Sequence, residues 1–325
     1  MSGLHNVTFT SSGAGTLYGN GQAWWGFISY LEISENRPRL FHISDATNIV
    51  MEHWYFEQSP YWTTLFDDVS DVTIRYCHID NRRNDWDKHA IWNLGAFNTD
   101  GFDLAGKNVH IHDCHIWNQD DCVCVKQIGR NGKNAQCSEN WLVENVYASG
   151  LGLTVGSIGA SRDHSCVRDI TFRNCTMHNT FKGIYLKSRP SGHGTGEITN
   201  ILYEDIVIEG AEQWAFWIGP QQAGYGGASS LAWPYLPGTK CPVPDNITWN
   251  NLTFRNILID SPSFSPGVIL GNETNPMSNI HFDNVRVKNG WAIPWFGEYY
   301  KTENVVNATA IGGTNPVPPF FKNLN

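Results

Sequence analysis

Three aspartates in two short motifs have a spacing that suits acid–base chemistry. Asp100 lies in NTDGFD, and Asp120 and Asp121 lie in NQDDCV, 20 and 21 residues later. Like charges held close together raise the pKa of at least one group, so one carboxyl can stay protonated beside an ionised neighbour. Hydrolysis of a glycosidic bond needs this combination, an acid for the leaving oxygen and a base or nucleophile on the other side of the sugar.

Two other interpretations of these aspartates remain open. Asp-Gly and Asp-Asp are common in turns, so the motifs can be turn formers. Three clustered carboxylates can also hold Ca²⁺. Two clusters separated by the length of one tight coil favour the acid–base interpretation, because the backbones of adjacent coils lie about 5 Å apart.

An internal repeat predicts the elements that bring the two motifs together. Each unit has an Asn or Asp, an alternating apolar stretch and a polar turn. Strict alternation predicts strands, and a period of about 30 residues is typical of solenoids, propellers and arrays. The chain is too short for propeller blades of four strands each, so we predict an all-β, single-domain parallel β-helix over residues 1–325. The repeats start at Asn6, Asn48, Asp71, Asn108, Asn140, Asp169, Asn200, Asn246, Asn279 and Asn304.

The cysteines follow the same register. Cys77, Cys114 and Cys175 take the same place in their repeats and are predicted to form an interior row of buried thiols, with disulfides as the alternative. Cys122 and Cys124 point to one side of a strand and should not pair with each other. We predict a bridge between Cys122 and Cys137, and another between Cys166 and a neighbour.

The composition limits the class of partner. A net charge of −9 with no basic face disfavours nucleic acid, and no apolar run is long enough for a membrane helix. Eight cysteines and a low charged fraction indicate a secreted protein, which we expect to be a monomer. No signal peptide precedes the first strand pattern. The sequence therefore begins either at an artificial boundary or after a missing N-terminal part of the fold.

Four motifs in order resemble those of glycoside hydrolase family 28, which includes polygalacturonases and rhamnogalacturonan hydrolases. They are NTDGFD, QDDCV, GLGLTVGSIG (150–159) and GIYLKS (183–188). The resemblance implies a right-handed parallel β-helix of the pectin-lyase-like type and hydrolysis with inversion, without a cofactor or metal. It makes Asp120 the general acid, with Asp100 and Asp121 activating the water. The carboxylates of this family lie closer together than the usual inverting spacing, so their separation does not decide the stereochemistry.

Two departures from the family pattern bear on the substrate. Polygalacturonases have a His in the third motif, where this chain reads Ser149-Gly150-Leu151-Gly152. They also have an Arg two residues before the Lys of the fourth motif, where this chain has Tyr185 before Lys187. Both changes resemble the rhamnogalacturonan-type branch. We therefore predict a rhamnogalacturonan-type or decorated pectic substrate, with homogalacturonan as the alternative.

Several residues near the motifs are candidates for substrate binding. Lys187 is the first choice for a substrate carboxylate, and the ring of Tyr185 suits a deoxy sugar. Lys126, together with Lys182 and Arg189, is a further candidate cation, with a solvated surface position as the alternative. Trp217 is predicted to stack on a sugar, or else to pack under the Gly-rich loop 219–238. A histidine group (His110, His112 and His115) resembles a metal motif but is expected to be a surface row.

Two functions of other classes compete with hydrolysis. A polysaccharide lyase can use the same fold, but it usually needs Ca²⁺ and a basic group, and no Arg lies within the two Asp motifs. A non-catalytic carbohydrate-binding solenoid would have no use for crowded like charges.

Overall fold

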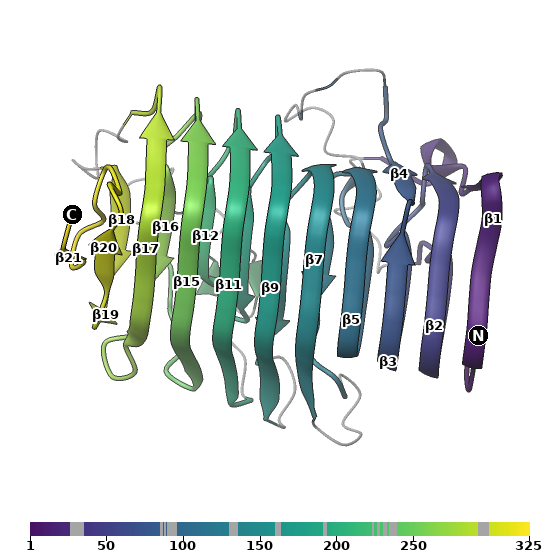
Figure 1. Cartoon of the computed structure of the whole chain (residues 1–325), viewed down its shortest axis with the longest axis horizontal. Coiled ribbons are helices and arrows are strands. Elements are labelled where there is room, and N and C mark those ends of the chain that lie inside the picture. Colours follow the sequence, from purple (N-terminus) through teal and green to yellow (C-terminus); the bar gives the residue numbers. More distant parts are fainter. Residues whose placement is uncertain are drawn as a thin grey trace.

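The computed structural model describes residues 1–26, 36–84, 87, 89, 96–129, 136–159, 164–190, 194–222, 224–225, 228–229, 233, 239–291 and 299–325. Nineteen of the described strands belong to one sheet (Figure 1). The long strands are β1 (His5–Tyr18), β2 (Phe41–Glu57), β3 (Thr64–Arg75), β5 (Phe102–Trp117), β7 (Cys137–Ser149), β9 (Ser165–His178), β11 (Gly196–Glu209), β15 (Ile247–Asp260) and β17 (Met277–Lys288).

Short strands alternate with the long ones along the chain. They are β4 (His78–Asp80), β6 (Val123–Val125), β8 (Leu153–Ile158), β10 (Ile184–Ser188), β12 (Phe216–Pro220), β16 (Gly267–Leu270), β18 (Tyr300–Glu303), β19 (Val305–Val306), β20 (Thr309–Ile311) and β21 (Lys322–Asn323). A separate antiparallel hairpin joins β13 (Gly224–Tyr225) and β14 (Ala228–Ser229). The 3₁₀ helix η1 (Gly21–Ala23) is one turn long, and no helix in the described residues has the length and hydropathy to cross a membrane.

The pairing pattern is that of a parallel β-helix, as predicted. The long strands pair in parallel with one another, for example β5 with β7 and β7 with β9. The short strands pair in the same way, for example β6 with β8 and β8 with β10. From β5 onward the chain therefore runs through a long strand, a turn and a short strand in each coil. The two ends of the chain lie at opposite ends of the stack (Figure 1).

Asparagine and aspartate repeats mark a bend inside each long strand. Asn108, Asn140 and Asp169 all have φ between 54° and 60°, the left-handed region that Asn and Asp tolerate better than other non-Gly residues. Each amide can also donate to the residue of the preceding coil, as Asn140 Nδ2 does to Asn108 Oδ1 at 3.3 Å. The repeat seen in the sequence is therefore a row of bends joined by side-chain hydrogen bonds.

The structure corrects two of the predicted repeat starts. The register of β11 with β15 places Asn251 rather than Asn246 beside Asn200, and Asn251 Nδ2 donates to Asn200 Oδ1 at 2.9 Å. The register of β17 with β20 likewise places Asn307 rather than Asn304 in the row. Each of these coils offers two Asn a few residues apart, and only the pairing of neighbouring strands decides between them.

A second row of bends follows five residues after the first. Asp113, Asn145 and Asn174 have φ of 53°, 55° and 50°. Asn145 Nδ2 donates to Asp113 Oδ1 at 3.2 Å, and its own Oδ1 accepts from Asn174 Nδ2 at 2.7 Å. Between the two rows the side chains alternate between the interior and solvent.

The interior is filled by rows of like side chains. Phe172, Tyr203 and Phe254 stack on adjacent strands, with ring centroids 4.6 Å and 5.6 Å apart. Cys77 and Cys114 are likewise buried free thiols, as is Cys175 two coils further along, which confirms the predicted interior row. His110, His112 and His115 lie on the outer surface of β5, also as expected.

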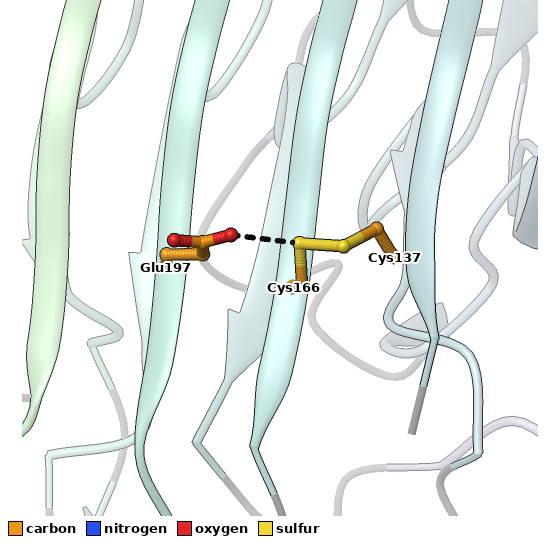
Figure 2. A group of neighbouring side chains, drawn as sticks. All are labelled: Cys137, Cys166 and Glu197. Atoms are coloured by element: carbon orange, nitrogen blue, oxygen red, sulfur yellow. Dashed lines mark hydrogen bonds between the residues drawn. A yellow bond between two sulfur atoms is a disulfide. The ribbon is translucent and has the colours of Figure 1, made fainter. Parts of the chain in front are cut away.

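The disulfide differs from one of the two predicted bridges. Cys137 pairs with Cys166, its register partner on the next strand, with Cα atoms 4.4 Å apart (Figure 2). This confirms a bridge from Cys166 to a neighbour and corrects the pairing of Cys137 with Cys122, which is a buried free thiol before β6. Glu197 of the following strand places Oε1 3.1 Å from Cys166 Sγ. Because both sulfurs are bonded to each other, this group is not a thiolate site for a metal.

Replacing Asn145 tests the bend rows. Asn145→Ala is expected to lower the free energy of unfolding by about 1–2 kcal/mol more than Asn145→Gly, because only Gly keeps the left-handed conformation without steric cost. Both variants lose the same side-chain hydrogen bonds, so Asn145→Gly is the matched control. Denaturant unfolding measures the difference, and equal losses would show that the bend conformation carries no cost.

Candidate active site

The first two motifs meet because they precede paired strands. Phe102 of β5 pairs with Val123 of β6, and Gly101 N donates to Asp121 O at 2.8 Å. Asp100 and Asp121 therefore occupy equivalent positions on adjacent coils. One carboxylate oxygen of each of Asp100, Asp120 and Asp121 lies within 4.8 Å of those of the other two. The three side chains therefore come together, as the spacing of the motifs predicted.

Glycine makes the close approach of the coils possible. A Cβ atom on Gly101 would come within 2.3 Å of Cys122 O. A Cβ atom on Gly150, in the third motif, would lie 2.6 Å from Asp120 O. Side chains at these two positions would push the coils apart and separate the carboxylates.

Asp120 and Asp121 have different surroundings although they are adjacent in sequence. Asp120 is partly exposed, and its two oxygens accept from the backbone N–H groups of Asp121 (2.9 Å) and Asn98 (3.2 Å). Asp121 is 1% exposed, receives a hydrogen bond from Thr154 Oγ1 at 3.0 Å and pairs with Lys187 Nζ at 2.6 Å. Asp120 therefore keeps part of its surface exposed, whereas Asp121 is buried against Thr154 and Lys187.

These surroundings move the pKa values of the pair in opposite directions. Burial and the negative charge of Asp121 raise the pKa of Asp120 to about 6. Burial alone would raise the pKa of Asp121 too, but the attraction of Lys187 and Lys126 outweighs it and leaves this pKa below its ordinary value. At mildly acidic pH the site thus holds a protonated Asp120 beside an ionised Asp121, as acid–base catalysis requires.

Asp100 and Asp103 complete the charged cluster. Burial raises the pKa of Asp100 well above its ordinary value, and the neighbouring Asp103 and Asp120 add to the rise. Asp103 pairs with Lys126 at 3.1 Å, and Lys126 Nζ also lies 3.7 Å from Asp121. Asp103 was not among the predicted site residues. The alternation at the start of β5, with Phe102 inside, was the signal that places Asp103 on the outer face.

Three of the four predicted cations, the lysines, lie in the site rather than on a solvated surface. Lys126, Lys182 and Lys187 are 8%, 2% and 7% exposed. Lys126 and Lys187 are ion-paired with protein carboxylates, so their first role in the unliganded protein is to neutralise the aspartates. The same two ammonium groups make the cluster a poor Ca²⁺ site, because they already neutralise the carboxylates that would otherwise bind the ion.

The two predicted aromatic contacts are corrected by their burial. Tyr185 and Trp217 are register partners on β10 and β12, and they are 3% and 0% exposed. The Tyr185 ring lies between the ammonium groups of Lys182 and Lys187, 4.9 Å and 4.4 Å from its centroid. It therefore supports two lysines and has no open face for a deoxy sugar.

Trp217 packs rather than stacks on a sugar. Its ring meets Trp214 and Trp233, and its Nε1 donates to Pro220 O at 2.8 Å. A ring without exposed surface has no face to offer a sugar, so the packing interpretation holds. Most of the loop 219–238 that was expected to cover it lies outside the described residues.

His89 is a buried residue that the sequence did not single out. Its ring lies between Trp117 and Phe181, and its Nε2 is 2.8 Å from Ser149 Oγ, at the start of the third motif. Burial lowers its pKa to about 3, so it stays neutral at working pH. Because His89 is neutral, it does not replace the positive charge that a third-motif His can carry. In the third motif itself, the register places Leu151 between Asp121 and Lys182 of the neighbouring coils.

The comparison with known proteins identifies the family. Residues 1–311 match the sequence model described as glycosyl hydrolases family 28. The chain belongs to this family. Among curated relatives it is 28% identical over 307 residues to an endopolygalacturonase of Emericella nidulans, covering 93% of this chain and 70% of that protein.

Other members of glycoside hydrolase family 28 differ in their named activities. An exopolygalacturonase of Cochliobolus carbonum is 30% identical (85% of this chain, 59% of the relative). A probable rhamnogalacturonase C of Aspergillus flavus is 28% identical (88% and 54%). The chain thus spans little more than half of the length of these two relatives.

Solved structures share the fold. Endopolygalacturonase I of Stereum purpureum has a TM-score of 0.65 at 19% identity, covering 92% of this chain and 78% of that one. The endo-xylogalacturonan hydrolase of Aspergillus tubingensis has a TM-score of 0.63 at 20% identity, covering 96% and 78%.

Removing Lys187 tests the electrostatics of the cluster. In the wild-type enzyme kcat/KM should rise as Asp121 ionises and fall above about pH 6, where Asp120 loses its proton. Lys187→Met removes a positive charge that lowers both pKa values, so the profile on a pectic substrate should move up by about 1–3 pH units.

The control removes an exposed ion pair instead. Arg168→Met breaks the 2.6 Å contact with Glu139 and should leave the profile unchanged. Because Lys187→Met leaves a buried carboxylate without its partner, Lys187→Met/Asp121→Asn should recover the unfolding midpoint if the single variant loses it. An unshifted profile in a folded Lys187→Met protein would contradict the assignment.

Proposed function

We propose that this chain hydrolyses galacturonate-containing pectic polysaccharide, with Asp120 as general acid. The observation that supports this best is the division of pKa values between two adjacent carboxyls, one raised to about 6 and one lowered. Family membership supports the reaction type, and the names of the relatives support the class of polymer.

The proposed reaction uses each carboxyl differently. Asp120, partly exposed and protonated below about pH 6, donates its proton to the glycosidic oxygen as the bond to the anomeric carbon breaks. Asp121, kept ionised by Lys187, takes a proton from the attacking water. Asp100, one coil away, holds this water in position. Attack from the side opposite the leaving group inverts the anomeric configuration, as the family resemblance implies.

We further propose a rhamnogalacturonan-type or decorated pectin as the preferred substrate. Of the three lysines at the carboxylates, two already pair with protein carboxylates, so few positive charges remain for a polymer with an acid on every ring. Leu151 and Tyr185, where polygalacturonases have His and Arg, remove two further polar groups. The probable rhamnogalacturonase relative and the xylogalacturonan hydrolase structure support this choice.

Elimination by a lyase is the weaker alternative. To act as the base, Lys187 would have to lose its proton, and the attraction of Asp121 raises its pKa above its ordinary value despite burial. We also propose that the protein is secreted and acts as a monomer without a nucleic-acid or membrane partner. The disulfide supports an oxidising compartment.

Replacing the acid tests the mechanism. Asp120→Asn should keep the unfolding midpoint and the affinity for substrate, and lose about 10²–10⁴-fold in kcat, because it cannot donate the proton. Asn98→Gly is a suitable control, since it keeps the backbone N–H that contacts Asp120, and Gly tolerates the φ of 56° at this position. Turnover above a few per cent of the wild-type value in Asp120→Asn would contradict the role.

A panel of polymers tests the substrate. Reducing-end release should be faster on rhamnogalacturonan or xylogalacturonan than on homogalacturonan at matched concentration. Products should lack the ultraviolet absorption of an unsaturated uronate. Faster cleavage of plain homogalacturonan would overturn the preference, and unsaturated products would replace hydrolysis by elimination.

A further inference from the structure

Lys182 differs from the other two lysines of the site. Lys126 and Lys187 contact Asp103 and Asp121 at 3.1 Å and 2.6 Å. In the described residues no carboxylate lies within 4 Å of Lys182 Nζ. Its contacts are a hydrogen bond to Gln213 Oε1 and the face of the Tyr185 ring, 4.9 Å from the centroid. Both partners are uncharged.

Lys182 lies in the same row of the β-helix as the site carboxylate Asp121. Val123, Leu153 and Ile184 are register partners on β6, β8 and β10. Two residues earlier on each coil are Asp121, Leu151 and Lys182, so Lys182 stands in the row of the catalytic carboxylate, two coils further along. At about 4.8 Å per coil, this separation is about 10 Å. An oligosaccharide bound along the row meets both residues.

A buried cation without a counter-ion is costly, and this one is 2% exposed. The contacts with Gln213 and Tyr185 fix its direction without neutralising it. Apolar side chains would fill the same space at lower cost, as Leu151 does one coil earlier. The arrangement suits a site whose negative charge arrives with the ligand. A carboxylate needs only one free N–H of the ammonium group, and one of its three donors contacts Gln213, whereas stacking on Tyr185 or Trp217 would need an exposed ring face.

We propose that Lys182 binds a galacturonate carboxylate of the substrate, with Tyr185 as the platform that holds its ammonium group in place. The inference rests on the proposed function, since it assigns the ligand from a pectic substrate. It transfers to Lys182 the role that the sequence assigned first to Lys187, which the Asp121 carboxylate already occupies.

The proposal gives substrate binding a dependence on pH. Burial and the repulsion of Lys187 lower the pKa of Lys182 to about 7, against the attraction of Asp120 and Asp121. The other groups that face it are neutral at working pH: Gln213 from the turn before β12, and Tyr185, whose pKa is raised. Lys182 is charged below pH 7, so carboxylate binding is complete there and weakens as the pH rises.

Binding to an inactive enzyme tests the proposal. The Asp120→Asn background stops turnover and removes the titration of Asp120. Calorimetry from pH 5 to 8.5 compares rhamnogalacturonan oligosaccharides with their galacturonate methyl esters. The Kd of the acid form should rise up to tenfold per pH unit above the pKa of Lys182, which lies below about 7 in this background because the attraction of Asp120 is removed, and the Kd of the ester should not change.

Two variants at Lys182 separate charge from structure. Lys182→Met should weaken binding of the acid form about 10- to 100-fold at pH 6, abolish the pH dependence and spare the ester. Lys182→Arg should keep binding of the acid form and remove its loss above pH 7, because Arg stays charged. In the active enzyme Lys182→Met should raise KM far more than it lowers kcat. The unfolding midpoint should hold or rise, since a buried charge is removed.

Each failure has a distinct meaning. Equal losses of acid and ester binding in Lys182→Met, or a pH dependence that persists in it, would overturn the role of Lys182 while hydrolysis stands. No binding of either form, together with no hydrolysis of any pectic polymer by the wild type, would overturn the proposed function and this inference with it.

Discussion

The parallel hydrogen bonding between successive coils is the constraint on which the site depends. It fixes neighbouring backbones about 4.8 Å apart and places equivalent residues of each coil in rows. Asp100 and Asp121 face each other because Gly101 N donates to Asp121 O and Phe102 pairs with Val123. The same geometry builds the Asn rows and the interior stacks, so one rule of register sets both stability and the crowding of charges.

The crowded carboxylates are tolerated because cations come from the same set of rows. The aspartates lie on the coils of β5 and β6. Lys126 directly follows β6, and Lys187 lies on β10, two coils further along. The ammonium groups reach back toward Asp103 and Asp121, and among the described residues no cation forms an ion pair with Asp120. This uneven neutralisation, more than the number of carboxylates, is what separates an acid from a base.

Substrate preference within the family can change while the backbone register of the coils stays the same. A side chain on the outer face of one coil can be exchanged without altering the backbone register. Leu151 lies one coil before Lys182 and Tyr185, and in the proposal above these positions set where a positive charge meets the substrate. Relatives named for different polymers belong to the same family. This agrees with a fold that depends on backbone pairing and a specificity that depends on side chains of the outer row.

The sequence by itself determined the β-helix, the convergence of Asp100 with Asp120 and Asp121, and the interior cysteine row. These follow from alternation and repeat length, which are local properties of the chain. The tertiary structure alone decided the repeat starts at Asn251 and Asn307 and the partner of Cys137, because both depend on which residues face each other across coils. It also decided the burial of Trp217 and the partners of the three lysines. A long side chain reaches across several coils, and neither its direction nor its counter-ion is encoded in the spacing of nearby residues.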